Sequence, residues 1–271
     1  GAYANFYYRP VECLLLEAGA RADEHDEFGG DTAWNLGAVY TVAESGTRLH
    51  ARVSDAYRNP SRLDSEFFPS FFSTQLPNPD LESEEIMGWE AGVTQSLGRH
   101  EVGITYFEQR LEDAIVTESR PSVGGAPRTI RVNRPGRSSV SGLEVAAGGK
   151  LGFERLNYRL AFTAQFDEEV IDLPDQLASI DIHYDFGIWL VGAGVSHVGA
   201  AAYLAEGNPL TDSRTTTRLY GQYRLNDSLT FHARVENLFD EEYELFPDTF
   251  GAGTQVEGPG RAFFVGATLT W

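Results

Sequence analysis

Arginines between residues 120 and 137 are the strongest candidates for chemistry in this sequence. The stretch holds Arg120, Arg128, Arg131, Arg134 and Arg137, five of the 21 basic residues in a chain whose formal net charge is -19. Guanidinium groups bind carboxylate or phosphate in bidentate fashion. The stretch therefore predicts an anion-binding site, for which we select Arg128, Arg131 and Arg134. A second interpretation, that these arginines bind lipid phosphates or nearby carboxylates, stays open at this point.

An acidic segment near the N-terminus is a candidate metal site. Asp23, Glu24, Asp26, Glu27 and Asp31 concentrate the hard oxygen donors that Ca²⁺ prefers. The segment lacks the fixed spacing of ligands and glycine that defines a known calcium loop. A structural Ca²⁺ site through Asp23, Asp26 and Asp31 and a solvated acidic loop are therefore both open. No other cofactor is expected.

Aromatic residues in the expected loops are candidate ligand contacts. Phe67 and Phe71 belong to the longest of these loops, residues 59 to 85, and Tyr203 and Tyr243 belong to two later loops. Exposed aromatic side chains indicate contact with another surface. That surface is either a planar or hydrophobic ligand or another part of the same protein.

Catalysis and nucleic-acid binding have little support. None of the six histidines has a Ser or Thr two residues after it, so no base and nucleophile share a strand face in this way. Cys13 is the only cysteine, which excludes an intramolecular disulfide. The excess of Asp and Glu argues against a nucleic-acid partner, whose phosphates require Lys and Arg. We therefore expect neither an enzyme nor a nucleic-acid binder.

The elements that must position these residues are long β-strands. Phe263, Val265, Ala267, Leu269 and Trp271 alternate with small or polar residues, and similar runs of about ten residues recur along the chain. That length fits a tilted strand crossing a membrane, with one face toward lipid. Since lipid offers no hydrogen bonds to the backbone, such strands must close into a barrel. The fold class is therefore predicted to be all-β, a transmembrane antiparallel β-barrel.

Short and long connections alternate between the expected strands, as they do in outer-membrane barrels. The expected strands start near Ala2, Cys13, Ala33, Arg48, Ile86, His100, Ile130, Arg155, Leu177, Ile188, Arg214, Leu229 and Arg261. Bacterial single-chain barrels have an even number of strands. The odd count of thirteen therefore predicts that an N-terminal part of the barrel is absent from this chain.

Ordered blocks between about residue 15 and the C-terminus resemble a known family. The segment Val-Glu-Asn-Leu-Phe-Asp-Glu-Glu-Tyr at 235–243, followed by Pro-Gly-Arg at 259–261, resembles the closing segment of TonB-dependent outer-membrane receptors. Earlier blocks fit the same family in the same order. These blocks are Ala-Tyr-Arg-Asn-Pro at 56–60, Asn-Pro-Asp-Leu at 78–81 with Glu84, Trp89-Glu90 with Gly92, and Asn133 with Val-Ser-Gly-Leu-Glu at 140–144. Their spacing is most similar to the vitamin B12 (cobalamin) receptor branch.

The C-terminal residues resemble the insertion signal of outer-membrane barrels. Gly266, Leu269 and Trp271 would form that assembly signal for the barrel assembly machinery, although Phe264 stands where the pattern usually has a polar residue.

The resemblance implies a bacterial outer-membrane location and a barrel of about twenty-two strands. Residues 1–271 would be roughly its thirteen C-terminal strands, without the N-terminal plug domain and TonB box. The implied function is active transport of a scarce nutrient, cobalamin or another corrinoid first and a ferric siderophore second, with a passive porin as the structural alternative. The implied partners are the ligand, TonB through the missing part, lipid and lipopolysaccharide.

Overall fold

The computed structural model describes residues 1–26, 29–69, 74–124, 126–152, 154–166, 173–202, 209–246 and 256–271. Their contacts divide the chain into two units. The first comprises Gly1–Val42, Arg48–Ala91 and Phe107–Val140; the second comprises Ala43–Thr47, Gly92–Tyr106 and Ser141–Trp271. None of the helices in these ranges has the length and apolar character needed to cross a membrane.

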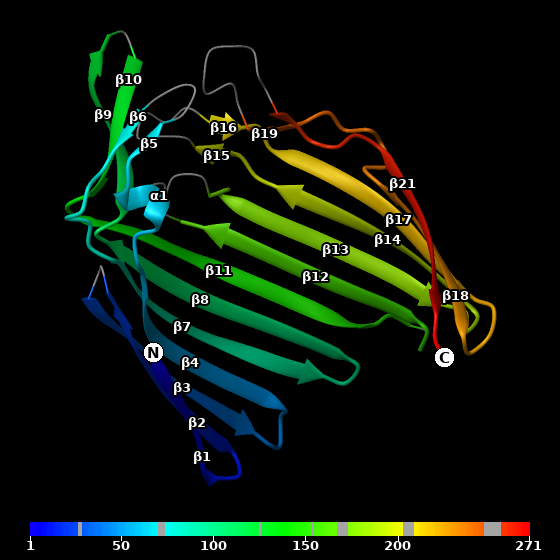
Figure 1. Cartoon of the computed structure of the whole chain (residues 1–271). Helices are drawn as coiled ribbons and strands as arrows, with labels where there is room; N and C mark the ends of the chain where they lie inside the picture. Colours follow the sequence, from blue (N-terminus) through cyan, green and yellow to red (C-terminus); the bar gives the residue numbers. More distant parts are fainter. Residues whose placement is uncertain are drawn as a thin grey trace. The chain divides into compact units, whose positions relative to one another are not determined.

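Thirteen strands form one antiparallel sheet in sequence order, with only loop elements skipped (Figure 1). They are β1 (Ala2–Val11), β2 (Leu14–His25), β3 (Gly29–Val42), β4 (Thr47–Arg58), β7 (Glu84–Leu97), β8 (His100–Glu112), β11 (Arg137–Lys150), β12 (Leu156–Gln165), β13 (Gln176–Asp185), β14 (Trp189–Val198), β17 (Arg214–Arg224), β18 (Leu229–Glu236) and β21 (Ala262–Leu269). The predicted count of thirteen is confirmed.

The two faces of this sheet follow the predicted alternation. In the register of β12 and β13, Leu160 lies opposite Ile180 and Arg159 lies opposite Asp181. Large apolar side chains stay uncovered, with Val265 87% exposed. A soluble sandwich would bury one face against a second sheet. The uncovered apolar face is instead what strands in contact with lipid require.

The seventh strand of the sheet is an exception, because its predicted start near Ile130 is wrong. Residues around Ile130 form β10 (Ala126–Asn133), which pairs with β9 (Ile115–Val123) as a hairpin, and the sheet resumes only at Arg137. Pro135 has no N–H for a ladder, and Gly136 has a φ of 110°. The Pro135-Gly136 pair therefore ends β10 and turns the chain into β11. Residues 118 to 129, which precede the expected strand start, consequently belong to a hairpin.

The expected loop from 23 to 32 is also mostly strand. β2 continues to His25 and β3 begins at Gly29, with Asp23 opposite Asp31. Arg21 forms an ion pair with Asp23 and so reduces the repulsion between these carboxylates.

The long connection after β4 has structure of its own. It contains α1 (Arg62–Ser65), β5 (Phe68–Pro69) and β6 (Thr74–Leu76). β5 and β6 join the hairpin in a four-stranded sheet of order β5-β6-β10-β9, which we name the loop sheet. Two small hairpins lie in later connections: β15 (Ala201–Ala202) with β16 (Pro209–Thr211), and β19 (Glu244–Phe246) with β20 (Val256–Glu257).

Candidate functional site

The loop sheet combines two connections that are distant in sequence. β6 runs parallel to β10, so that Thr74 lies opposite Arg128 and Leu76 opposite Ile130. On its other side β10 is antiparallel to β9. The connection after β4 and the connection after β8 therefore form one hydrogen-bonded body in the first unit.

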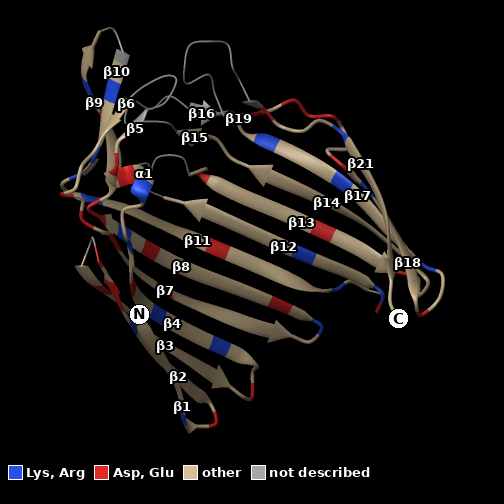
Figure 2. Cartoon of the chain, viewed as in Figure 1, with Lys and Arg blue, Asp and Glu red and all other residues tan. Residues whose placement is uncertain are grey.

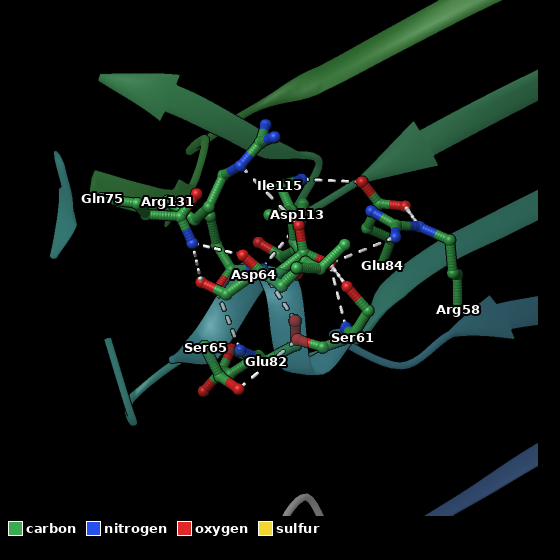
Figure 3. Close-up of polar contacts among 12 residues, drawn as sticks. Arg58, Ser61, Asp64, Ser65, Gln75, Glu82, Glu84, Asp113, Ile115 and Arg131 are labelled. Atoms are coloured by element: carbon green, nitrogen blue, oxygen red, sulfur yellow. Dashed lines mark hydrogen bonds and ion pairs between the residues drawn. The ribbon is translucent and has the colours of Figure 1, made fainter. Parts of the chain in front are cut away.

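Asp64 ties this body to the main sheet. The side chain of Ser61 caps α1, and the Asp64 carboxylate accepts hydrogen bonds from the Ser61 backbone N–H at 2.9 Å and hydroxyl at 2.7 Å. The same carboxylate lies 3.5 Å from Nη1 of Arg58, at the end of β4, and 3.7 Å from Nε of Arg131, on β10 (Figure 3). Asp64 is only 8% exposed, so these contacts occur largely away from water.

The electrostatics of Asp64 favour its charged form. Burial raises the pKa of this carboxyl, but the two Ser61 hydrogen bonds and the positive charges of Arg58 and Arg131 lower it, and the net pKa lies below its usual value. Nε of Arg131 is buried and has no hydrogen-bond partner among the described residues. The Asp64–Arg131 contact is therefore an ion pair without a direct hydrogen bond.

Glu84, the first residue of β7, makes the second connection. Its carboxylate accepts a hydrogen bond from Nε of Arg58 and another, at 2.7 Å, from the backbone N–H of Ile115. Ile115 is the first residue of β9 and is buried. Glu84 thus joins the end of β4 to the start of the hairpin. We name Arg58, Asp64, Glu84, Arg131 and Asn133 the loop anchor.

Asparagine side chains complete the loop anchor and its surroundings. The Asn133 amide accepts from the Glu82 N–H at 2.9 Å and donates to the carbonyls of Glu82 at 2.9 Å and Asp113 at 2.8 Å. Asn78 donates to the Arg131 carbonyl at 2.8 Å. These contacts fix backbone groups that belong to no regular ladder. Asn78, Glu84 and Asn133 belong to the blocks that carried the family resemblance, but their convergence on one place was not predicted.

The structure divides the arginine stretch between different surroundings. On β10, Arg131 and Arg128 point to opposite faces, because they are three positions apart along a strand. Arg120 pairs with Glu118 at 3.1 Å and Arg137 with Glu112 at 2.7 Å, as the alternative interpretation expected. Arg134 is exposed and follows β10. The trio Arg128, Arg131 and Arg134 is thus not gathered on one face.

The aromatic candidates occupy separate places. Phe67, immediately before β5, is 57% exposed. Tyr243, in the second unit, is half-buried, with the Arg214 guanidinium 5.1 Å from its ring centroid. It borders a cavity of about 490 Å³. Phe71 and Tyr203 lie outside the described residues. Ligand contact by these four residues stays a prediction.

The acidic segment does not form a metal cage in the described residues. Asp23 accepts hydrogen bonds from Arg21 and from the Tyr57 hydroxyl, and Asp31 accepts one from the Ser83 hydroxyl at 3.2 Å. No group of three or more His, Cys, Asp or Glu residues is placed to hold a metal ion in the part of the chain that the structure describes. The described geometry therefore does not assemble Asp23, Asp26 and Asp31 as Ca²⁺ ligands.

A second group of contacts, on the polar face of the second unit, surrounds a single carboxylate. Asp181, on β13, accepts hydrogen bonds from Nη2 of Arg218 at 2.8 Å and the Tyr220 hydroxyl at 2.6 Å, both from β17. Strand β14 lies between them, and its Gly192 and Gly194 leave the necessary space. A Cβ on Gly192 would lie 2.3 Å from Cζ of Tyr220, and one on Gly194 would lie 2.7 Å from Nε of Arg218. We name this arrangement the wall clasp. Figure 2 shows basic positions on β12 and β17 and an acidic position on β13.

The closing segment explains the unusual position of Phe264. In β21, Phe264 lies opposite Arg234, whose guanidinium is 4.3 Å from its ring centroid, so the ring fits the polar face as a cation–π partner. Gly266 lies opposite His232 and Leu269 opposite Leu229. Trp271 follows the strand and is fully exposed. Their role as an assembly signal stays a prediction.

Asn237 closes the last long connection. This residue is 5% exposed. Its side-chain amide accepts a hydrogen bond from the Glu241 N–H and donates one to the Glu241 carbonyl, both at 2.8 Å. It also donates to the Pro259 carbonyl at 3.2 Å. It thus links the two ends of the connection between β18 and β21.

Comparison with known proteins identifies the family of this chain. A family model described as TonB dependent receptor-like, beta-barrel matches residues 1–238. The chain belongs to this family. Members of the TonB-dependent receptor family are receptors and transporters of the bacterial outer membrane rather than enzymes, and the predicted location is therefore confirmed.

Curated relatives of this TonB-dependent receptor chain include two vitamin B12 transporters named BtuB. The one from Photobacterium profundum is 22% identical over 248 residues, which are 89% of this chain and 39% of the relative. The one from Vibrio vulnificus (strain YJ016) is 23% identical over 258 residues, 93% of this chain and 39% of the relative. The chain thus spans about two-fifths of the length of these relatives.

Solved structures share the fold. A mutant (G324V) of the ferric enterobactin receptor PfeA from Pseudomonas aeruginosa superposes with a TM-score of 0.80 at 20% identity, over 99% of this chain and 44% of that one. The copper transporter OprC superposes with a TM-score of 0.79 at 17% identity, over 99% and 47%. These likenesses confirm the TonB-dependent receptor barrel as the fold class.

Proposed function

We propose that this chain is the C-terminal barrel portion of a TonB-dependent receptor that takes up cobalamin or a related corrinoid. The observation that carries the proposal is the match to vitamin B12 transporters over about nine-tenths of the chain. Because the match covers about two-fifths of those relatives, we propose that the whole protein also has an N-terminal plug domain and the remaining strands.

The loop sheet supports a role in ligand capture. Rigid scaffolds that present loops are the usual form of a recognition site. Here Asp64, Glu84 and Asn133 hold two long connections against the ends of β4 and β7. A preformed surface loses less conformational freedom when it binds a ligand, and this favours the capture of a scarce nutrient.

The proposed mechanism has two stages. The long connections first bind the ligand outside the cell. TonB then acts on the plug of the whole protein to open a path through the barrel. In this scheme the residues of this chain bind the ligand and form the wall, and chemistry on the ligand is not required of them.

A ferric siderophore is an equally plausible substrate. Ferric enterobactin receptors are among the solved structures of the same fold, and the siderophore receptor PirA from Acinetobacter baumannii has a TM-score of 0.76. A passive porin is a third candidate, and it differs from both in needing no TonB.

Uptake assays on the complete gene product distinguish the three candidates. A Gram-negative host that lacks its own cobalamin receptor is given the complete gene, with and without a functional tonB gene. The proposal predicts that labelled cyanocobalamin accumulates only in the host with TonB. Accumulation of a ferric siderophore but not cobalamin would replace the substrate, and accumulation without TonB would favour a porin.

A further inference from the structure

Two arginines of the β9–β10 hairpin form a pair that the sequence alone did not single out from the arginine stretch. Arg128 lies directly opposite Arg120 in the antiparallel register. Directly opposite residues place their Cβ atoms about 5 Å apart, and like charges at such positions destabilise a strand pair. Figure 2 shows basic residues on β10 in the loop sheet. The repulsion between the two guanidinium groups lowers stability, so we expect another interaction to favour the pair.

Neutralisation within the chain is incomplete. Glu118 pairs with Arg120 at 3.1 Å, but no carboxylate of the described residues forms an ion pair with Arg128. The third arginine on these strands differs: Arg131, on the opposite face, is paired with Asp64.

The backbone holds both side chains in place. Each arginine adjoins a proline, Pro121 after Arg120 and Pro127 before Arg128, and a proline fixes its own φ. The register shifts between Ala126 and Arg128, a bulge of the kind that redirects side chains near functional sites. Below the pair, the loop anchor fixes the start of β9 through Glu84 and Ile115. The backbone positions of the two arginines are therefore fixed opposite each other.

We propose that Arg120 and Arg128 form a two-arginine site for an oxyanion of the phosphate-ester class. Two planar guanidinium groups on one face match the tetrahedral oxygens of such a group, and the bound anion supplies the missing negative charge. The anion has two sources with the same chemistry. One is the phosphodiester within cobalamin, in which case the inference rests on the proposed function; the other is a phosphate of lipopolysaccharide.

The first experiment tests the site itself with inorganic pyrophosphate. The complete receptor in detergent is titrated while ³¹P line broadening is recorded. Replacing both Arg120 and Arg128 with Gln weakens binding by about tenfold or more, since each lost charge-assisted hydrogen bond is worth a factor of that size. Added salt weakens binding by the wild-type receptor. A receptor that does not bind pyrophosphate, or binds it equally well without both arginines, overturns the inference.

The variants include two matched controls. Replacing Arg9, near the end of β1, and Arg155, in the turn before β12, with Gln removes the same charge on the short-connection side and leaves pyrophosphate binding unchanged. Replacing Arg120 and Arg128 with Lys keeps the charge but not the planar geometry, and restores only part of the affinity. Full restoration by Lys would contradict a bidentate site. Heat-modifiable migration of each variant verifies that the barrel is folded.

A second experiment identifies the source of the anion. Cyanocobalamin is compared with cobinamide, a corrinoid without the nucleotide loop and its phosphodiester. If only cyanocobalamin binding weakens in the Gln variant, the transported ligand supplies the phosphate. If only the retention of phosphorylated lipid A weakens, lipopolysaccharide supplies it. If cyanocobalamin binding and lipid A retention are both unchanged in the Gln variant, the inference is overturned. A wild-type receptor that binds no corrinoid overturns the proposed function instead, and the pyrophosphate result then decides whether the site exists.

Discussion

The loop anchor and the wall clasp both hold carboxylates in place, but they use groups from different kinds of segment. Each surrounds carboxylate with arginine and neutral donors. The anchor draws its groups from separate segments of the first unit, whereas the clasp uses β13 and β17, the two strands that flank β14 in the second. The side chains of Asp64 and Glu84 are 11% exposed and that of Asp181 is 22% exposed. An irregular connection therefore depends on buried, convergent contacts. A regular sheet needs only correct register and glycines that leave space.

The first prediction concerns Glu84, because its loss should have the largest effect on the stability of the loop anchor. Glu84→Ala leaves Arg58 without a hydrogen-bonded carboxylate and the buried Ile115 N–H without its acceptor. Arg58 is half exposed and stays 3.5 Å from Asp64, so the main cost is the unsatisfied buried N–H of Ile115, about 1–3 kcal/mol. The loss is expected locally, as faster hydrogen exchange and proteolysis in β9 and β10, while the main sheet keeps its protection.

Glu82→Gln is the matched control for this prediction. Glu82 is two residues away, and its backbone rather than its side chain contacts Asn133. The control should exchange like the wild type. If the hairpin of the Glu84→Ala receptor is equally protected, the loop anchor does not hold the loop sheet.

The second prediction tests the space that glycine provides in the wall clasp. Gly192→Ala places a Cβ 2.3 Å from Cζ of Tyr220, so the ring must move and its hydrogen bond to Asp181 is lost. We expect a cost of about 1 kcal/mol, the value of one such bond. The measurement is the midpoint of the heat-induced mobility shift of the complete receptor.

A double-mutant cycle makes this test specific. In a Tyr220→Ala background the new Cβ meets no ring, so Gly192→Ala should cost nothing. Gly148→Ala on β11 is a control, because its Cβ would make only an ordinary contact, at 3.5 Å from the Tyr158 carbonyl. Equal costs in both backgrounds would show that Gly192 acts independently of the clasp.

These two regions also differ in how far the sequence predicts them. The strands of the clasp follow from alternation, a local signal, and in the observed register Arg159 and Asp181 lie opposite each other on one face. The anchor depends on contacts between segments far apart in sequence, and periodicity carries no information on such contacts. The misplaced seventh strand had a local signal, Pro135-Gly136, and the hairpin it defines places Arg128 and Arg131 on opposite faces.

The third prediction is a pH dependence of the loop anchor. Because the pKa of Asp64 is lower in the folded protein than its usual value of about 3.9, its ionised form stabilises the fold above that value. The contribution is constant from neutral pH down to about pH 5 and is lost as the pH falls through the depressed pKa. Protection of the hairpin, corrected for the intrinsic exchange rate, should follow this course.

Asp64→Asn isolates the contribution of this single carboxyl. The variant lacks a titrating group at the position, so the difference in protection between wild type and variant should shrink below about pH 4. Acid loss by carboxylates that do not interact with Asp64 affects both proteins and cancels in the difference. Glu84 is not among them, because the charge of Asp64 acts on its carboxyl. A difference that stays constant into the acid range would mean that the folded pKa of Asp64 is not the cause.

The last prediction has no expected effect on stability and tests the register on which the clasp depends. In a Cys13→Ser background, a cysteine at position 160 should react with a lipid-soluble thiol reagent, whereas a cysteine at 159 should react with a water-soluble one. Leu160 lies opposite Ile180 on the apolar face, and Arg159 lies opposite Asp181 on the polar face. A slip of one residue would exchange the two results, because it moves every side chain to the other face. The same slip would carry Asp181 away from Arg218 and Tyr220, so the labelling pattern decides whether the clasp can exist in the membrane.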